Sequence, residues 1–268
     1  PKPQNPNRMN KIFCLILLII CQHSCDLCQL YNYKLQSHTI SSHMESSRKY
    51  IVGGNWKSNG SVDFVRTQCT EVLNTMSFDQ SKLDVVVAPV FIHIASAKAM
   101  LNESVSVAAQ NVSAHKNGAF TGEVSADQIK DFGVNWAIIG HSERRSLFGE
   151  TNEVVATKVT RAQEAGLNTI LCIGEQLAER EAGTTNDVLK EQLDAVKLAV
   201  SDWSRVVIAY EPVWAIGTGK VATPEQAQET HAYVRSWLTD NISADVAAAT
   251  RIQYGGSANA GNAATLIA

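Results

Sequence analysis

The amino-acid sequence predicts an α/β fold, and within that class a (β/α)₈ barrel truncated before its eighth strand. From residue 50 onward, short apolar runs alternate with amphipathic stretches, and each apolar run is continuous rather than interrupted at every second position. Such runs are typical of parallel strands that are covered on both faces. Seven repeats of this pattern follow one another with no inserted second domain, which favours a closed barrel over an open, doubly wound sheet.

Seven segments are predicted to be strands, and several stretches between them to be helices. The strands are residues 50–56, 84–89, 105–111, 136–141, 169–174, 206–211 and 251–256. The helices are residues 125–132, 153–165, 188–200 and 224–238, the last with Thr223 as N-cap and Pro224 at its first position. The chain stops at AATLIA, inside a helical pattern, and seven strands alone would leave an unpaired edge. We therefore expect a C-terminal truncation.

Composition and charge restrict the classes of function. The chain has 268 residues, of which 45% are hydrophobic and 18% charged, enough for a substantial core. The formal net charge of −3 provides no basic surface for nucleic acid, so an anionic substrate would need a local positive site. Only Cys69 and Cys172 lie beyond the first thirty residues, which is unlike a disulfide framework and indicates a reduced, intracellular protein.

Residues 1–43 are interpreted separately from the barrel domain, which spans residues 44–268. Lys11 followed by IFCLILLIIC resembles the apolar core of a signal peptide and is too short for a membrane span, but no small-x-small cleavage site follows it. We expect residues 1–43 to be non-native upstream sequence or an optional leader, disordered and outside the fold. Cys25 and Cys28 could be half of a metal or redox site, but no second CxxC accompanies them, so we interpret them as incidental.

Polar side chains gather at the predicted carboxyl ends of the strands, where barrel enzymes carry their chemistry. The first strand ends at Asn55-Trp56-Lys57, the fourth at His141-Ser142-Glu143, the sixth at Glu211 and the seventh at Gly255-Gly256-Ser257. Each of these has an ordinary structural explanation when taken alone. Together they bring a lysine, a histidine and a carboxylate to one rim, beside a glycine-rich turn suited to phosphate. This set predicts proton transfer on a small phosphorylated substrate.

Six motifs carry a resemblance to a known family. VGGNWKSN, NGAFTGEVSA, IIGHSERR, LCIGE, AYEPVWAIGTGK and YGGS occur in this order, and from about Tyr50 to its end the chain resembles the triosephosphate isomerases. The resemblance implies a TIM barrel without cofactor or metal. It also implies an aldose–ketose isomerase of glycolysis and gluconeogenesis, which interconverts dihydroxyacetone phosphate and D-glyceraldehyde 3-phosphate through an enediolate. The family completes its phosphate site with a Gly-Gly pair after the eighth strand, which leaves the activity of the shortened chain open.

The resemblance also implies roles for the residues at the rim. Glu211 would be the base, and a neutral His141 the electrophile at the carbonyl oxygens. Asn55 and Lys57 would support the charge of the substrate and of the enediolate. Two further residues would act on these: Glu143 is expected to orient Lys57, and Ser142 to be the N-cap of a helix whose dipole points at the imidazole.

A lid is predicted directly after the base. Pro212 restricts φ and Trp214 packs, so the segment can swing as a unit. The resemblance implies that Gly217 brings a backbone N–H to the phosphate and that Ser257 also binds it. An exposed enediolate phosphate would eliminate phosphate, so the lid protects the intermediate. The predicted lid residues are Pro212, Val213, Trp214, Ala215, Ile216, Gly217, Thr218, Gly219 and Lys220.

The stretch NGAFTGE, residues 117–123, resembles the dimer contact of the family. The resemblance implies that Phe120, Thr121 and Gly122 meet a neighbouring subunit and that Thr121 reaches its active site. We therefore expect a homodimer acting on a triose phosphate, with no nucleic-acid or membrane partner.

Alternatives remain for both function and location. Another phosphate-binding barrel, such as an aldolase or a metal-dependent epimerase, would need a lysine inside a strand or several His and Asp ligands, and only His141 is available. A barrel without enzymatic activity would need a broken catalytic trio, and all three residues are present. The expected location is the cytoplasm, with secretion or an organelle as the alternative if residues 9–43 form a leader. The choice depends on whether translation starts at Met9 or Met44.

Overall fold

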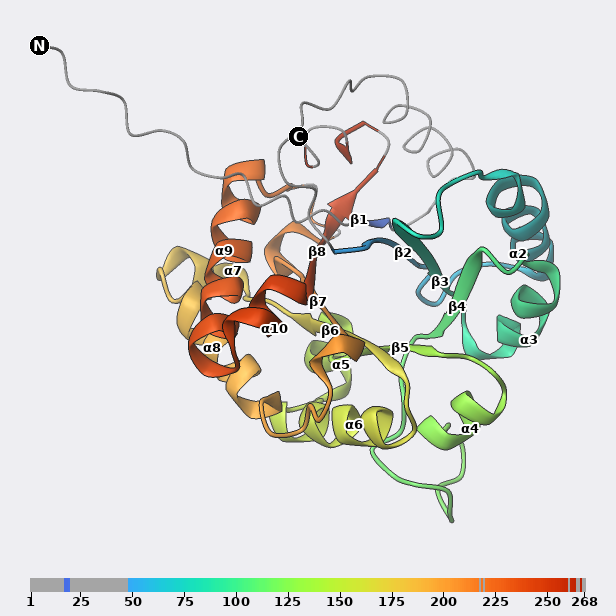
Figure 1. Cartoon of the computed structure of the whole chain (residues 1–268), viewed down its shortest axis with the longest axis horizontal. Helices are drawn as coiled ribbons and strands as arrows, with labels where there is room; N and C mark the ends of the chain where they lie inside the picture. Colours follow the sequence, from blue (N-terminus) through green and yellow to red (C-terminus); the bar gives the residue numbers. More distant parts are fainter. Residues whose placement is uncertain are drawn as a thin grey trace, which may run out of the picture.

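The chain forms a closed parallel barrel, which confirms the predicted fold class (Figure 1). The computed structural model describes residues 17–19, 48–216, 218, 220–259, 261–263 and 266. Within these residues, eight strands follow one another around the ring in chain order. They are β1 Leu17–Ile19, β2 Tyr50–Asn55, β3 Leu83–Ala88, β4 Val105–Ala109, β5 Trp136–Ile139, β6 Asn168–Ile173, β7 Val206–Tyr210 and β8 Arg251–Ala258.

The ring combines the seven strands predicted from residue 50 onward with one short strand from the amino-terminal segment, so the expectation that residues 1–43 lie outside the fold is wrong for Leu17–Ile19. Leu18 of β1 is in register with Gly53 of β2, and Leu17 is in register with Tyr254 of β8, both in parallel. β1 therefore occupies the place between β2 and β8, as Figure 1 shows. Since an open sheet edge exposes unpaired backbone groups, this pairing gives both outer strands of the seven a partner.

Helices connect successive strands and cover the outside of the ring. The four predicted helices are present as α4, α6, α8 and α9, with α8 beginning three residues earlier than predicted and ending four residues earlier, at Val196. The α-helices in the described part of the chain are α2 Val62–Thr67, α3 Phe91–Met100, α4 Ala126–Asp131, α5 Ser142–Phe148, α6 Asn152–Glu164, α7 Leu177–Glu181, α8 Thr185–Val196, α9 Pro224–Asn241 and α10 Ala244–Ala249. None of them is both long and apolar enough to cross a membrane.

Alternate residues of each strand pack on opposite faces, which explains why the apolar runs are continuous. In β3, Val86 and Ala88 belong to the cluster inside the ring, together with Trp136 and Ile138 of β5. Val85 and Val87 belong to the larger cluster between the strands and the helices. A strand with apolar neighbours on both faces cannot alternate between apolar and polar residues, as expected for a parallel barrel.

Three residues separate helix α9 from the predicted lid, and the first turn of the helix is fixed by a capping box. The Thr223 hydroxyl accepts the Gln226 backbone N–H at 3.2 Å, and the Gln226 side chain accepts the Thr223 N–H at 2.9 Å. Pro224 at the first helical position removes a donor that would otherwise lack a partner. The predicted cap and proline are thus confirmed. Together they fix the residue at which helix α9 begins.

We expect the change Thr223→Ala to lower the free energy of unfolding by about 1 kcal/mol, because it leaves the Gln226 N–H without its acceptor. Equilibrium denaturation in urea measures the loss. Thr223→Ser keeps a hydroxyl at the same position and is the matched control. If the serine variant loses as much stability as the alanine variant, the stability at this site does not come from the cap.

Candidate active site

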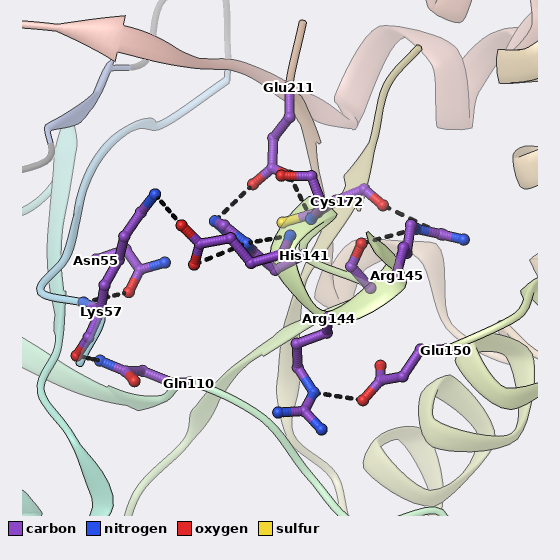
Figure 2. A network of polar contacts seen from close by, with 12 residues as sticks. Asn55, Lys57, Gln110, His141, Arg144, Arg145, Glu150, Cys172 and Glu211 are labelled. Carbon is purple, nitrogen blue, oxygen red and sulfur yellow. Dashed lines mark hydrogen bonds and ion pairs between the residues drawn. The ribbon is translucent and has the colours of Figure 1, made fainter. Parts of the chain in front are cut away.

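Four predicted site residues meet at the carboxyl end of the barrel. Asn55 is the last residue of β2, His141 follows β5 by two residues, and Glu211 directly follows β7. Lys57 lies two residues beyond β2 and reaches toward the same place. Figure 2 shows their side chains pointing toward one another from these different strands. Parallel strands in a ring end on one rim, which is why residues far apart in sequence come together here.

Glu211 is a buried carboxylate, with 1% of its surface exposed. Its Oε2 accepts the Ser142 backbone N–H at 2.8 Å, and its Oε1 lies 3.2 Å from His141 Nε2 (Figure 2). The neighbouring backbone is close as well: a Cβ on Gly255 would lie 2.8 Å from Glu211 Cγ, and a Cβ on Gly174 would lie 1.7 Å from the Glu211 carbonyl oxygen. Glycine is therefore required at both positions for β6, β7 and β8 to enclose the carboxylate.

His141 is itself the N-cap of α5, so the prediction that Ser142 is the N-cap was wrong. The imidazole Nδ1 accepts the Glu143 backbone N–H at 3.2 Å, in the way that a short polar side chain usually caps a helix. A nitrogen that accepts a hydrogen bond carries no proton, so this contact assigns a neutral imidazole with its hydrogen on Nε2. Nε2 is the atom that faces Glu211.

Lys57 is held in an uncommon backbone conformation by its neighbours. Its φ is +50°, in the left-handed region that a residue with a side chain rarely adopts. The Lys57 N–H donates to Asn55 Oδ1 at 2.9 Å, and Gln110 Nε2 donates to the Lys57 carbonyl and to the Ala88 carbonyl, each at 2.8 Å. The ammonium group forms an ion pair with Glu143 Oε1. These contacts aim a positive charge into the site.

Gln110 was missed by the sequence analysis, although the rule that found the others applies to it. It directly follows β4, at the same rim, and its amide connects the ends of β2 and β3 (Figure 2). Its place in the predicted third strand, residues 105–111, made it look like a strand residue rather than one at a strand end.

The predicted lid is anchored at its first hinge by Glu175, which is fully buried. The Glu175 carboxylate accepts the Tyr210 hydroxyl at 3.0 Å and Trp214 Nε1 at 2.9 Å, and its carbonyl accepts the Val213 N–H at 3.1 Å. Burial, together with the Glu175 charge, raises the pKa of Tyr210 well above its ordinary value, so the hydroxyl stays protonated and donates. Residues 213–215 form one 3₁₀ turn.

The remaining predicted site residues belong to the lid, the end of β8 and the dimer loop. In the predicted lid, Thr218 Oγ1 donates to the Trp214 carbonyl at 2.7 Å, which closes a turn within the segment. Gly217 and Gly219 lie outside the described residues. Ser257 lies near the end of β8, and its carbonyl accepts Asn262 Nδ2 at 3.0 Å. In the segment between β4 and α4, Phe120 stacks on His115 with ring centroids 4.0 Å apart, and this loop projects from the barrel at the bottom of Figure 1.

The described residues contain no group of three or more His, Cys, Asp or Glu that could hold a metal ion. Cys25 and Cys28, interpreted as incidental, lie outside the described residues. Cys172 is fully buried on β6, and burial, with the Glu211 carboxylate beside it, raises the pKa of its thiol well above the ordinary value. It therefore stays protonated and packs against Glu211 as a small neutral group.

Comparison with known proteins identifies the family. The family model described as triosephosphate isomerase matches residues 50–268. The chain is 53% identical over 223 residues to the chloroplastic triosephosphate isomerase of Secale cereale, covering 83% of this chain and 74% of that protein. It is 49% identical over 241 residues to the chloroplastic enzyme of Arabidopsis thaliana, covering 87% and 76%. It is 50% identical over 222 residues to the cytosolic enzyme of Oryza sativa subsp. japonica, covering 82% and 87%.

The matched region begins at the first residue of β2 and includes the buried carboxylate, the neutral imidazole and the lysine described above. The chain belongs to the triosephosphate isomerase family.

Proposed function

We propose that Glu211, His141, Lys57 and Asn55 together carry out the interconversion of dihydroxyacetone phosphate and D-glyceraldehyde 3-phosphate, the activity of the family. The observation that carries this assignment is the pairing of a buried carboxylate with a neutral imidazole, Glu211 Oε1 lying 3.2 Å from His141 Nε2. The reaction moves a proton between two adjacent carbons and shifts the carbonyl from one to the other. It therefore needs a base at the carbons and a donor at the oxygens.

Glu211 is the base in this proposal. Its burial keeps bulk water away from the carboxylate, so water does not compete with the substrate for its oxygens. The Ser142 N–H donates to Oε2, so the charge is stabilised by a donor that is already in place, while Oε1 accepts no hydrogen bond from the described residues. The carboxylate takes the proton from the carbon next to the carbonyl and returns it to the neighbouring carbon.

His141 donates through Nε2–H to the substrate oxygen on which negative charge develops. Since Nδ1 accepts the Glu143 N–H, the only ring hydrogen is the one directed into the site. A neutral donor stabilises the enediolate without transferring its proton completely. Lys57 supplies the positive charge for an anionic substrate, and Asn55 supports it by accepting the Lys57 N–H.

Closure of the lid completes the site. The first lid residue, Pro212, directly follows the base, and the hinge is tied to the barrel through Glu175. A movement of the lid therefore acts at the base through one peptide bond, and it excludes water while the enediolate exists. Gly217 and Ser257 are proposed to bind the phosphate.

We also propose that the chain works as a homodimer, with Phe120, Thr121 and Gly122 at the contact. Large apolar side chains are exposed on the connections that follow β3, β4 and β5: Ile92 is 83% exposed, Phe120 41%, Leu147 74% and Phe148 66%. These three strands are neighbours in the ring, so their connections lie next to one another at the carboxyl end. Large apolar side chains that are exposed on neighbouring connections are typical of a contact with another chain.

Its proposed location is the cytoplasm, the compartment in the name of the Oryza relative; the Secale and Arabidopsis relatives are named chloroplastic. Expression of the whole chain and of a chain begun at Met44, each with a fluorescent tag, distinguishes a leader from untargeted sequence.

The change Glu211→Asp withdraws the base by one methylene while keeping its charge. We expect kcat for dihydroxyacetone phosphate to fall by about 10²-fold or more, with little change in KM, because misplacing a catalytic group by about 1 Å has that effect. An assay coupled to oxidation of the glyceraldehyde phosphate measures both constants. Glu225→Asp, in the first turn of α9, is the control. An unchanged kcat for Glu211→Asp would remove Glu211 from the mechanism.

For the dimer, we expect the whole chain to sediment at twice its own mass and the Leu147→Asp variant to sediment as a single chain. A charged side chain placed in an apolar contact cannot be buried without a partner. Leu198→Asp is the matched control, because Leu198 is 95% exposed but precedes β7, at the opposite end of the barrel. Sedimentation of Leu147→Asp as a dimer would show that this surface is not the interface.

A further inference from the structure

The Arg145 side chain binds backbone carbonyls at the ends of two strands. Its Nε donates to the Gly140 carbonyl at 2.8 Å, and its Nη2 lies 3.5 Å from the Cys172 carbonyl. The third contact holds the arginine itself, since Nη1 donates to Asn152 Oδ1 at 2.8 Å. Gly140 directly follows β5, and Cys172 lies near the end of the adjacent strand β6, so one guanidinium connects the carboxyl ends of the two strands (Figure 2).

The Gly140 carbonyl is the last backbone acceptor before the catalytic histidine. Gly140 has a φ of +75°, and a Cβ there would lie 3.0 Å from Val155 Cγ1 and 3.1 Å from Arg145 Nη2. The position therefore needs glycine both for its conformation and for the close approach of the arginine. Holding this carbonyl fixes the peptide plane that leads into His141, and through it the direction of the Ser142 N–H that binds Glu211.

Arg145 also brings a positive charge close to the base. Burial lowers the pKa of its guanidinium, and the nearby Cys172, Glu211 and Glu150 groups oppose that effect. A partly buried cation is retained only where hydrogen bonds and opposite charges compensate its desolvation. The three contacts above and the two carboxylates provide that compensation.

A cavity of about 450 Å³ is lined by Arg145, Gly140, Ser142 and Glu211, and also by Asn152, which holds the arginine. Its volume is large enough to admit a guanidinium ion beside the position of the Arg145 head group.

We propose that Arg145 is a positioning residue for the isomerisation. It joins the ends of β5 and β6 and sets the turn at residues 140–142, so that the His141 imidazole and the Ser142 N–H stand at the correct distance from the Glu211 carboxylate. The inference rests on the proposed roles of His141 and Glu211. Arg145 itself touches neither the substrate nor the reacting atoms.

The test compares Arg145→Ala with Arg205→Ala in the whole chain. Arg205 is a matched control, because its Nη1 also donates to a backbone carbonyl, that of Gly166, at 2.8 Å, but before the amino end of β6. We expect Arg145→Ala to lower kcat by about 10²-fold, with KM changed less than threefold, as about 1 Å of misplacement would do. Arg205→Ala should leave both constants within about twofold of the wild type, since surface changes away from the site have small effects.

Rescue separates positioning from a general loss of structure. Guanidinium chloride at about 10–50 mM should raise kcat of Arg145→Ala by about tenfold, because the ion can occupy the space of the lost head group and bind the same carbonyls. Urea, which has a similar shape but no charge, and sodium chloride at equal ionic strength should have no effect. Arg205→Ala should not respond to guanidinium.

Three outcomes would overturn the proposal: kcat of Arg145→Ala close to the wild type, a loss confined to KM, or a reduced kcat that guanidinium does not restore. If Arg145→Ala does not fold, Arg145→Lys takes its place. Lysine keeps the charge and the stem but cannot bind two carbonyls in one plane, so a wild-type kcat in a folded lysine variant would also contradict the proposal. If Glu211→Asp leaves kcat unchanged in the same assay, the underlying site assignment fails, independently of Arg145.

Discussion

The hydrogen bond between the Ser142 N–H and the Glu211 carboxylate is the contact on which the site depends. It joins the segment after β5 to the residue after β7, across the end of β6, and the carboxylate it binds is almost completely removed from water. A buried carboxylate is tolerated only when donors face it. The first turn of α5 provides one: the Ser142 N–H binds Glu211, while the Glu143 N–H binds the imidazole Nδ1 and leaves Nε2 facing Glu211. One helix start therefore positions both side chains and places the imidazole hydrogen on Nε2.

Around this contact, the barrel contains an uncommon backbone conformation and two close approaches of the backbone. Both are stable only in a well-packed environment. Lys57 has a positive φ and is held by Asn55 and Gln110, and Gly174 and Gly255 are glycine because the Glu211 backbone and side chain leave no space for a Cβ. Strain of this kind concentrates at functional sites, where the surrounding fold compensates for it. The apolar layers on both faces of the strands, formed by the interior cluster and by the larger outer cluster, provide that rigidity.

Much of this arrangement could be predicted from the sequence, because its signals are local. Continuous apolar runs identify buried parallel strands, and polar residues at their ends identify the rim, which is how Asn55, Lys57, His141 and Glu211 were found together. The N-cap of α5 was assigned to Ser142 because serine is the commoner cap, whereas an imidazole nitrogen has that role here. Gln110 and Arg145 act through backbone carbonyls, and such contacts leave no periodic pattern in a sequence.

The pairing of β1 with β8 has a consequence for how the chain folds. Leu17 and Tyr254 are in register although almost the whole chain separates them, so the ring contains a contact of nearly maximal sequence separation. The other strand pairs join segments that are neighbours in sequence and can form early. Closing a loop of that length costs conformational entropy that is recovered only after both partners have met. The barrel wall is therefore expected to assemble progressively from β2 to β8, with closure of the ring as the last and slowest step, completed only after Tyr254 has been synthesised.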